Sequence, residues 1–274
     1  MVINQKTMDK MHDIQFEMLK ELINVMDELQ IKYYFVHGSL LGAIRDHDFI
    51  AEDDDIDIAI FRKDYDKLLK YGNNMLGNSY FLQNTINDNY PLAFAKMRNN
   101  NTTFWQPILD GYNCNQGMYI DIFPIDFTPN NSILFKVRIK LLNIRINSLM
   151  KDCESIIYKI AKFASKLRYP SLREAMLKRE KLLNELRETS FVSIYGGKTS
   201  EFNMPIEWFG DGEYFLFRNI LVRCPKCYKE YLTRIYGADY LDHNPALSRM
   251  DDKKRIEVSA NIIDFEKSYK EYRN

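Results

Sequence analysis

The segment from Gly38 to Asp57, GSLLGAIRDHDFIAEDDDID, constrains the fold of this chain more than any other stretch. It is followed by the alternating pattern IDIAIF, so we expect its dense group of carboxylates to run into a β-strand. A solvated acidic loop is the alternative interpretation, but the run enters an apolar strand and not a polar tail. Alternation with period two places Asp55 and Asp57 on one face of the strand. Crowded carboxylates of this kind predict a Mg²⁺ site, and Mn²⁺ would fit the same oxygens.

Helix and strand patterns alternate through the first half of the chain. Apolar residues recur every three or four positions over 8–29, which predicts an amphipathic helix, and a second helix is expected over 63–71. The expected strands cover 33–37, 56–61, 80–83, 92–98 and 118–123. This order predicts an α+β fold (mixed α/β), with a mixed sheet flanked by helices and a helical insertion with a C-terminal region.

Three regions are expected along the chain. Residues 1–129 form the catalytic core, 130–190 a helical region, and 191–274 a C-terminal segment that packs back on the core through its aromatic residues. In the helical region Ser171 and Glu174 predict a capping box at the start of a helix that ends near Glu188. The same region is basic at Lys136, Arg138, Lys140 and Arg145. This bias indicates either a solvated helix face or contact with an anionic acceptor or with lipid headgroups.

Charge and cysteine content exclude several classes of protein. Lys and Arg together number 38, as do Asp and Glu, so the chain has no net positive charge that would favour binding to nucleic acid. The N-terminus lacks the pattern of an export signal, and no apolar run is long enough for a membrane span. Four cysteines do not indicate a disulfide framework, and the pair at Cys224 and Cys227 lacks the second pair of a structural zinc site. We therefore expect a cytoplasmic protein, with peripheral contact at the inner face of the membrane left open.

A strand, a Gly-Ser turn and a D-x-D motif on a second strand match the arrangement of nucleotidyltransferase folds. In this arrangement Gly38 lets the backbone approach a phosphate, and Ser39 with the following helix N-terminus donates hydrogen bonds to it. Asp55 and Asp57 are the expected metal ligands. The best third carboxylate is Asp121 in MYIDIFPID, because a carboxylate among such hydrophobic residues is costly unless it binds something. We expect Asp121 to hold a second metal or to accept a proton.

Further polar residues are candidates for substrate binding. Lys96 and Arg98 are two positions apart and share a strand face, where they would grip a diphosphate or simply be solvated. Arg45 lies between the Gly-Ser turn and the carboxylates, where it would offset their charge. His37 at the strand end is expected to be packed or hydrogen-bonded, and Asp126 to cap a turn.

The motif HGSLLGAIRDHDFIAEDDDIDIAI resembles the signature of the LicD family of phosphotransferases, usually GTLLGAxR followed by a DDDID block. The resemblance continues in KMRNNNTTF, in YIDIFPID and in CPKCYKEYLTRIYGADYLDHNP, so it spans about Tyr33 to Pro245. Ser39 replaces the commoner Thr and keeps the hydroxyl, and Ala51-Glu52 stands where the family often has Pro-Trp. The helices between Ser132 and Glu188 match no family motif.

This resemblance implies a metal-dependent transferase that uses a CDP-activated alcohol, typically CDP-choline. Phosphocholine would pass to a sugar hydroxyl of a cell-surface polysaccharide, such as lipopolysaccharide or teichoic acid, or to its lipid-linked precursor, with release of CMP. Ribitol-phosphate transferases are relatives, so the motif does not fix the transferred group.

Three other functions remain open from the residues alone. A nucleotidyltransferase that uses an NTP and releases pyrophosphate needs the same turn and carboxylates. A sugar-nucleotide glycosyltransferase also uses a D-x-D motif, although usually after a longer nucleotide-binding half. A member that binds nucleotide without turnover is the non-enzymatic alternative, and the presence of all three carboxylates argues against it.

Overall fold

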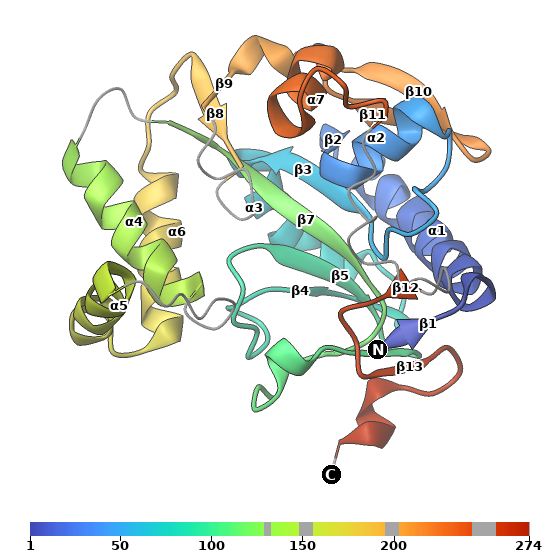
Figure 1. The fold of residues 1–274 in the computed structure, drawn as a ribbon, viewed down its shortest axis with the longest axis horizontal. Coiled ribbons are helices and arrows are strands. Elements are labelled where there is room, and N and C mark those ends of the chain that lie inside the picture. Colours follow the sequence, from blue (N-terminus) through green and yellow to red (C-terminus); the bar gives the residue numbers. More distant parts are fainter. Residues whose placement is uncertain (129–132, 148–155, 195–202, 243–255, 274) are drawn as a thin grey trace.

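A mixed β-sheet lies at the centre of the structure, a computed structural model that describes residues 1–128, 133–147, 156–194, 203–242 and 256–273 (Figure 1). Its strands run in the order β2-β3-β7-β5-β4, and β8 and β9 extend it at the far end of β7. Only the β3–β7 pair within this sheet is parallel, while β2, β5 and β4 pair antiparallel with their neighbours. The expected α+β fold with a mixed sheet is confirmed.

The strands of this sheet have the following bounds: β2 Tyr33–Phe35, β3 Asp57–Phe61, β4 Tyr80–Gln83, β5 Ala95–Asn99, β7 Tyr119–Phe127, β8 Phe191–Ser193 and β9 Met204–Pro205. The remaining strands form two-stranded pairs: β1 Val2–Ile3 with β12 Ile256–Glu257, β6 Thr103–Trp105 with β13 Ile262–Asp264, and β10 Glu213–Phe217 with β11 Ile220–Cys224. The helices are α1 Gln5–Glu28, α2 His37–Arg45, α3 Arg62–Tyr71, α4 Ile133–Asn147, α5 Ile156–Arg168, α6 Leu172–Asn184 and α7 Tyr228–Tyr236.

The first helix follows the apolar pattern of its sequence. The side chain of Asn4 caps α1 by accepting a hydrogen bond from the Thr7 amide at 2.9 Å, which satisfies one of the free N–H groups of the first turn. Its buried face includes Met18, Leu22 and Val25, at the expected three- and four-residue spacing. Since α1 contacts β7 and β5, this face covers the middle of the sheet.

Strand β7 is longer than expected, because it continues through Pro124 to Phe127. A proline ends most strands, since it has no N–H to donate. Pairing with β5 stops at Ile122, opposite Ala95, so the missing N–H of Pro124 falls beyond the end of β5. On its other side Pro124 still pairs with Ile60 of β3, and eight of the nine residues of β7 are buried.

The helical region lies to one side of the sheet, at the left of Figure 1. Helices α4 and α6 pack together, and Ser171 caps α6 by accepting a hydrogen bond from the Glu174 amide at 3.3 Å. Arg62 of α3 joins this region to the sheet, since it pairs with Asp126 of β7 at 2.6 Å and also with Glu180 of α6. The expectation that Asp126 caps a turn was therefore wrong, because its carboxylate is buried against a guanidinium within the sheet.

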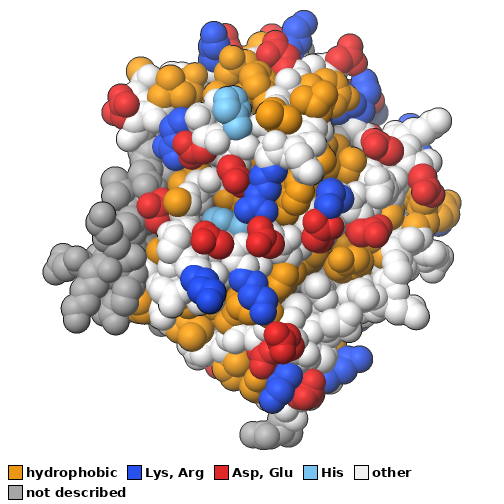
Figure 2. Space-filling model, turned by 90° about the vertical axis from the view of Figure 1, so that its right-hand side faces the viewer, with side chains coloured by type: hydrophobic (Ala, Val, Ile, Leu, Met, Phe, Trp, Pro, Cys, Tyr) orange, Lys and Arg blue, Asp and Glu red, His pale blue; other side chains and the backbone are white. Residues whose placement is uncertain are grey.

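The C-terminal segment contacts the first part of the chain at several places. Phe217 packs edge-on against Phe35 of β2 with 5.2 Å between ring centroids, and Arg218 donates hydrogen bonds to Asp48 at 2.7 Å and to Asp13 at 2.8 Å. Strand β12 pairs with β1, so the N-terminus lies beside a segment more than 250 residues away in the sequence. On the face shown in Figure 2, acidic and basic side chains are interspersed, in keeping with the balanced composition.

Candidate active site

Strand register brings the predicted carboxylates together. Asp57 of β3 lies opposite Asp121 of β7, and Asp121 lies opposite Lys96 of β5 on its other side. Asp55 comes two residues before Asp57, at the entry to the strand. One carboxylate oxygen from each of Asp55, Asp57 and Asp121 lies within 4.8 Å of the others, a geometry that suits a single hard cation. Thus residues far apart in the sequence meet at the start of two parallel strands.

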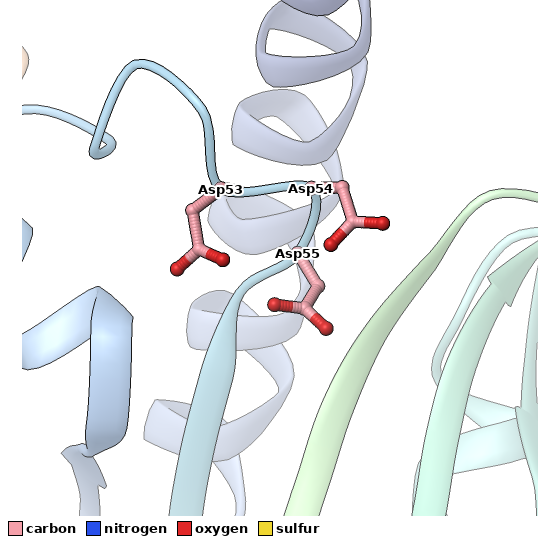
Figure 3. Close-up of side chains that lie close together, drawn as sticks. All are labelled: Asp53, Asp54 and Asp55. Carbon is pink, nitrogen blue, oxygen red and sulfur yellow. The ribbon is translucent and has the colours of Figure 1, made fainter. Parts of the chain in front are cut away.

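A second group of carboxylates adjoins the first. Asp53, Asp54 and Asp55 lie on the loop that leads into β3, beside α1, as Figure 3 shows, and their oxygens also lie within 4.8 Å of one another. The loop is anchored to α1 because the Gln15 amide donates to the Asp54 carbonyl at 2.8 Å and the ring Nε2 of His12 lies 2.7 Å from the Asp53 carbonyl. These contacts hold the acidic loop against the body of the protein.

Burial and mutual repulsion shift the protonation of the carboxylates. Burial, with repulsion from Asp57 second, raises the pKa of Asp55 well above its usual range. Burial also raises the pKa of Asp121 to about 6, although the nearby Lys96 ammonium acts in the opposite direction. A divalent cation among these oxygens would favour their ionised forms, so the donor set and its electrostatics fit Mg²⁺.

Lys96 is the immediate partner of Asp121. Its ammonium forms an ion pair with the Asp121 carboxylate, and its side chain is only 2% exposed. The ammonium also lies over the ring of Tyr119, 3.4 Å from the ring centroid, and burial lowers its pKa. A solvated strand face, the alternative left open by the sequence, is wrong for this residue. Lys96 places a fixed positive charge beside the carboxylates, and its direct contact with a diphosphate stays a prediction.

Arg98 lies in the protein interior and not on a solvated face. Its side chain is fully buried, with Nε donating to the Gln83 side chain at 2.8 Å and Nη1 donating to the Gly117 carbonyl at 2.9 Å. These bonds tie β5 to β4 and to the segment before β7. The structure thus gives Arg98 a supporting place behind the site, and its expected grip on a diphosphate has no support from its position.

The prediction that Gly38 and Ser39 form a turn before the helix was wrong, because both residues belong to the first turn of α2. The chain reverses one residue earlier, at His37, whose φ is +51°. Ser39 is buried, and its Oγ accepts a hydrogen bond from the Asp57 amide at 2.8 Å. Ser39 therefore holds the strand that carries Asp57, and its hydroxyl proton remains for donation.

Gly38 allows a close approach, although the group that approaches is a carboxylate. A Cβ at this position would lie 2.1 Å from Oδ2 of Asp53, a residue that is only 6% exposed. We expect Gly38→Ala to lower the free energy of unfolding by about 1–3 kcal/mol, because the buried carboxyl group has little room to move. Thermal unfolding would measure this change. Gly77→Ala is the matched control, since a Cβ there meets nothing within 4 Å, and equal stability of the two variants would contradict the close packing of Asp53.

Arg45 and His37 occupy different positions relative to the carboxylates. Arg45, in the last turn of α2, pairs with the adjacent Asp46 at 2.6 Å, and a bond to that carboxylate raises its pKa. Its role at the substrate stays a prediction. His37 places Nδ1 at 3.4 Å from Oδ2 of Asp57 and packs edge-on against Phe123, with 5.3 Å between ring centroids. The expectation that His37 is packed or hydrogen-bonded agrees with this position, but its contact with a metal-site carboxylate was missed.

Comparison with known proteins identifies a matching family model and a related protein. Residues 30–143 match the family model described as LicD/FKTN/FKRP, nucleotidyltransferase domain, a range that includes every predicted site residue. The chain is also 26% identical over 240 residues to the lipopolysaccharide cholinephosphotransferase LicD of Haemophilus influenzae, an alignment that covers 80% of this chain and 85% of that protein. The three carboxylates that meet at β3 and β7 thus lie within the segment that matches this family model.

Proposed function

We propose that this chain transfers a substituted phosphate group from a CDP-activated alcohol to a sugar hydroxyl, and that the group is phosphocholine. The main support is the meeting of Asp55, Asp57 and Asp121 within 4.8 Å in a segment that matches the LicD family model. The Haemophilus relative is named a lipopolysaccharide cholinephosphotransferase, which favours a choline-bearing donor and a glycan acceptor for this chain as well. The acceptor would be a cell-surface polysaccharide or its lipid-linked precursor.

The reaction forms one bond and breaks another at the same phosphorus. The acceptor hydroxyl oxygen attacks the phosphorus distal to the cytidine, and the bond between that phosphorus and CMP breaks. Mg²⁺ held by Asp55, Asp57 and Asp121 would supply positive charge for the phosphate oxygens. A carboxylate of the site, with Asp121 as the candidate, would take up the proton that the acceptor hydroxyl loses.

The surrounding residues would position these groups. The Ser39 Oγ accepts a hydrogen bond from the Asp57 amide, and the same hydroxyl, at the start of α2, would donate to a phosphate of the donor. The Lys96 ammonium would limit repulsion between the carboxylates and the anionic donor. Catalysis would come mainly from this fixed electrostatic environment.

Donor turnover tests the proposal. The purified protein would be incubated with Mg²⁺ and separately with CDP-choline, CDP-ribitol and NTPs, and the products would be followed by mass spectrometry. The expected result is metal-dependent release of CMP from one CDP-alcohol, by slow hydrolysis when no acceptor is present. Pyrophosphate release from an NTP would instead support the nucleotidyltransferase alternative.

Absence of turnover calls for a binding measurement. Calorimetric titration with CDP-choline and CMP in the presence of Mg²⁺ would detect a donor site that requires its acceptor for turnover. If neither compound binds, the proposed donor class is wrong.

A further inference from the structure

Helix α5 exposes a stripe of large apolar side chains to solvent. Ile160, Phe163 and Leu167 are 64%, 65% and 69% exposed, the largest such group on a single helix among the residues that the structure describes. Their spacing of three and four residues places them on one face of the helix. Ser165, which is fully buried, marks a different face of the helix, and α5 packs on α4. Three adjacent residues of this size are unusual on a helix face with no partner.

Basic residues accompany this stripe. Helices α4 and α5 contain no Asp or Glu, although the whole chain is balanced in charge. Exposed cations of the two helices include Arg138, Lys140, Lys159, Lys166 and Arg168. Lys159 and Lys166 lie beside the apolar stripe on the helix circumference. A long lysine side chain in this position can keep its ammonium in water while the neighbouring apolar side chains are buried. The charged side chains that α5 itself carries beside its exposed apolar stripe are therefore all positive.

We propose that α5 lies in the surface of an anionic lipid bilayer, with Ile160, Phe163 and Leu167 inserted among the acyl chains. Apolar side chains on one face and lysines at its edge are the combination that interfacial helices use. Charge complementarity favours anionic headgroups, and a second protein would have to offer an apolar groove ringed by acidic residues. The described part of α5 is 13 residues long, too short to cross a bilayer, and no described helix of the chain combines the length and apolarity of a membrane span. The helix would therefore lie in the plane of the surface.

This surface goes beyond the proposed transfer reaction and does not depend on it. Residues 156–168 lie outside the segment that matches the family model, and none of them belongs to the carboxylate groups. A helix that holds the protein at a bilayer would bring it to lipid-linked acceptors, if those are its substrates. Binding to vesicles and release of CMP from a soluble donor can consequently be measured separately.

Vesicle cosedimentation tests the inference. The full chain would be mixed with two kinds of vesicle, one of phosphatidylcholine alone and one of phosphatidylcholine with about 30% phosphatidylglycerol. The second kind has a negatively charged surface. We expect binding to the anionic vesicles that is at least tenfold stronger than to neutral ones and that weakens in high salt. The triple variant Ile160→Asn, Phe163→Asn, Leu167→Asn should bind at least tenfold more weakly, and Lys159→Gln with Lys166→Gln should reduce the preference for anionic lipid.

A matched control removes exposed apolar surface elsewhere. Leu216 and Leu221 are 50% and 62% exposed and lie opposite one another on the β10–β11 hairpin. Leu216→Asn with Leu221→Asn should leave vesicle binding unchanged, and circular dichroism would show that all variants fold. Equal binding of the wild type and the α5 variant, or loss of binding only in the hairpin variant, would overturn the inference. The inference would also be overturned if the wild type does not bind vesicles but forms a dimer in solution, and if the α5 substitutions dissociate that dimer.

Discussion

Asp55→Asn is expected to lower the rate of CMP release by at least about 10²–10³-fold while leaving the fold intact. The estimate follows from the cost of removing one electrostatic contact to the transferred phosphate. Asp55 belongs to both carboxylate groups, so its loss removes a ligand that the other acidic residues of the loop cannot replace in the same position. Release of CMP from the active CDP-alcohol, measured at saturating donor and Mg²⁺, checks this expectation.

The same substitution should stabilise the metal-free protein. Burial and repulsion raise the pKa of Asp55 in the folded state, so the folded protein binds this proton more tightly than the unfolded chain does. The stability that comes from protonation is present at low pH and is lost as the pH rises through the folded pKa. In EDTA we expect Asp55→Asn to melt at a higher temperature than the wild type at pH 8, with the difference shrinking toward pH 4.

Two outcomes would contradict the role given to Asp55. Near wild-type release of CMP by the variant would show that the carboxylate is not needed for the reaction. A lower melting temperature at pH 8 in EDTA would show that Asp55 is stabilised by its surroundings. Asp46→Asn is the matched control, since this Asp lies in the same part of the chain, pairs with Arg45 and belongs to neither carboxylate group.

Lys96→Met is expected to lower the free energy of unfolding by about 3–5 kcal/mol in EDTA, the usual cost of removing one partner from a buried ion pair. The Asp121 side chain is 9% exposed in the wild type, and the variant would leave its carboxylate with Asp57 close by and no ammonium beside it. The pKa of Asp121 should therefore rise further. Urea unfolding at pH 7 measures the loss, with Lys63→Met, which alters an exposed lysine of α3, as the control.

A second substitution distinguishes the loss of the ion pair from the loss of packing as the cause of the lower stability. Adding Asp121→Asn to Lys96→Met removes the unpaired charge, so a large part of the lost stability should return. If the double variant is as unstable as the sum of the two single variants, the pair is not coupled and Lys96 acts through its packing on Tyr119. If Lys96→Met is as stable as Lys63→Met, the buried ion pair is not significant for the fold.

The sequence predicted the parts of the site that depend on local pattern. Alternation after Asp55 identified β3, and the apolar neighbours of Asp121 identified the buried strand β7. The two carboxylates meet because β3 and β7 are adjacent and parallel, with Asp57 opposite Asp121. Adjacency of this kind is a tertiary property that neither local pattern contains.

The remaining features depend on contacts that no local pattern contains. Lys96 and Arg98 share a strand face with alternating polarity, which is equally typical of solvated residues, and only the position of β5 between β4 and β7 buries them. Asp126 follows a proline that resembles a turn signal, yet its partner Arg62 is 64 residues away in the sequence. Likewise, the carboxylate over Gly38 belongs to Asp53, on the loop after α2.

The most direct test of the metal site is a crystal structure of the protein with CDP-choline and Mn²⁺, in which the manganese gives an anomalous signal. The account predicts an anomalous peak among the carboxylate oxygens of Asp55, Asp57 and Asp121, with the donor diphosphate beside it. A peak at other residues, or a donor bound with no manganese at these three carboxylates, would contradict it.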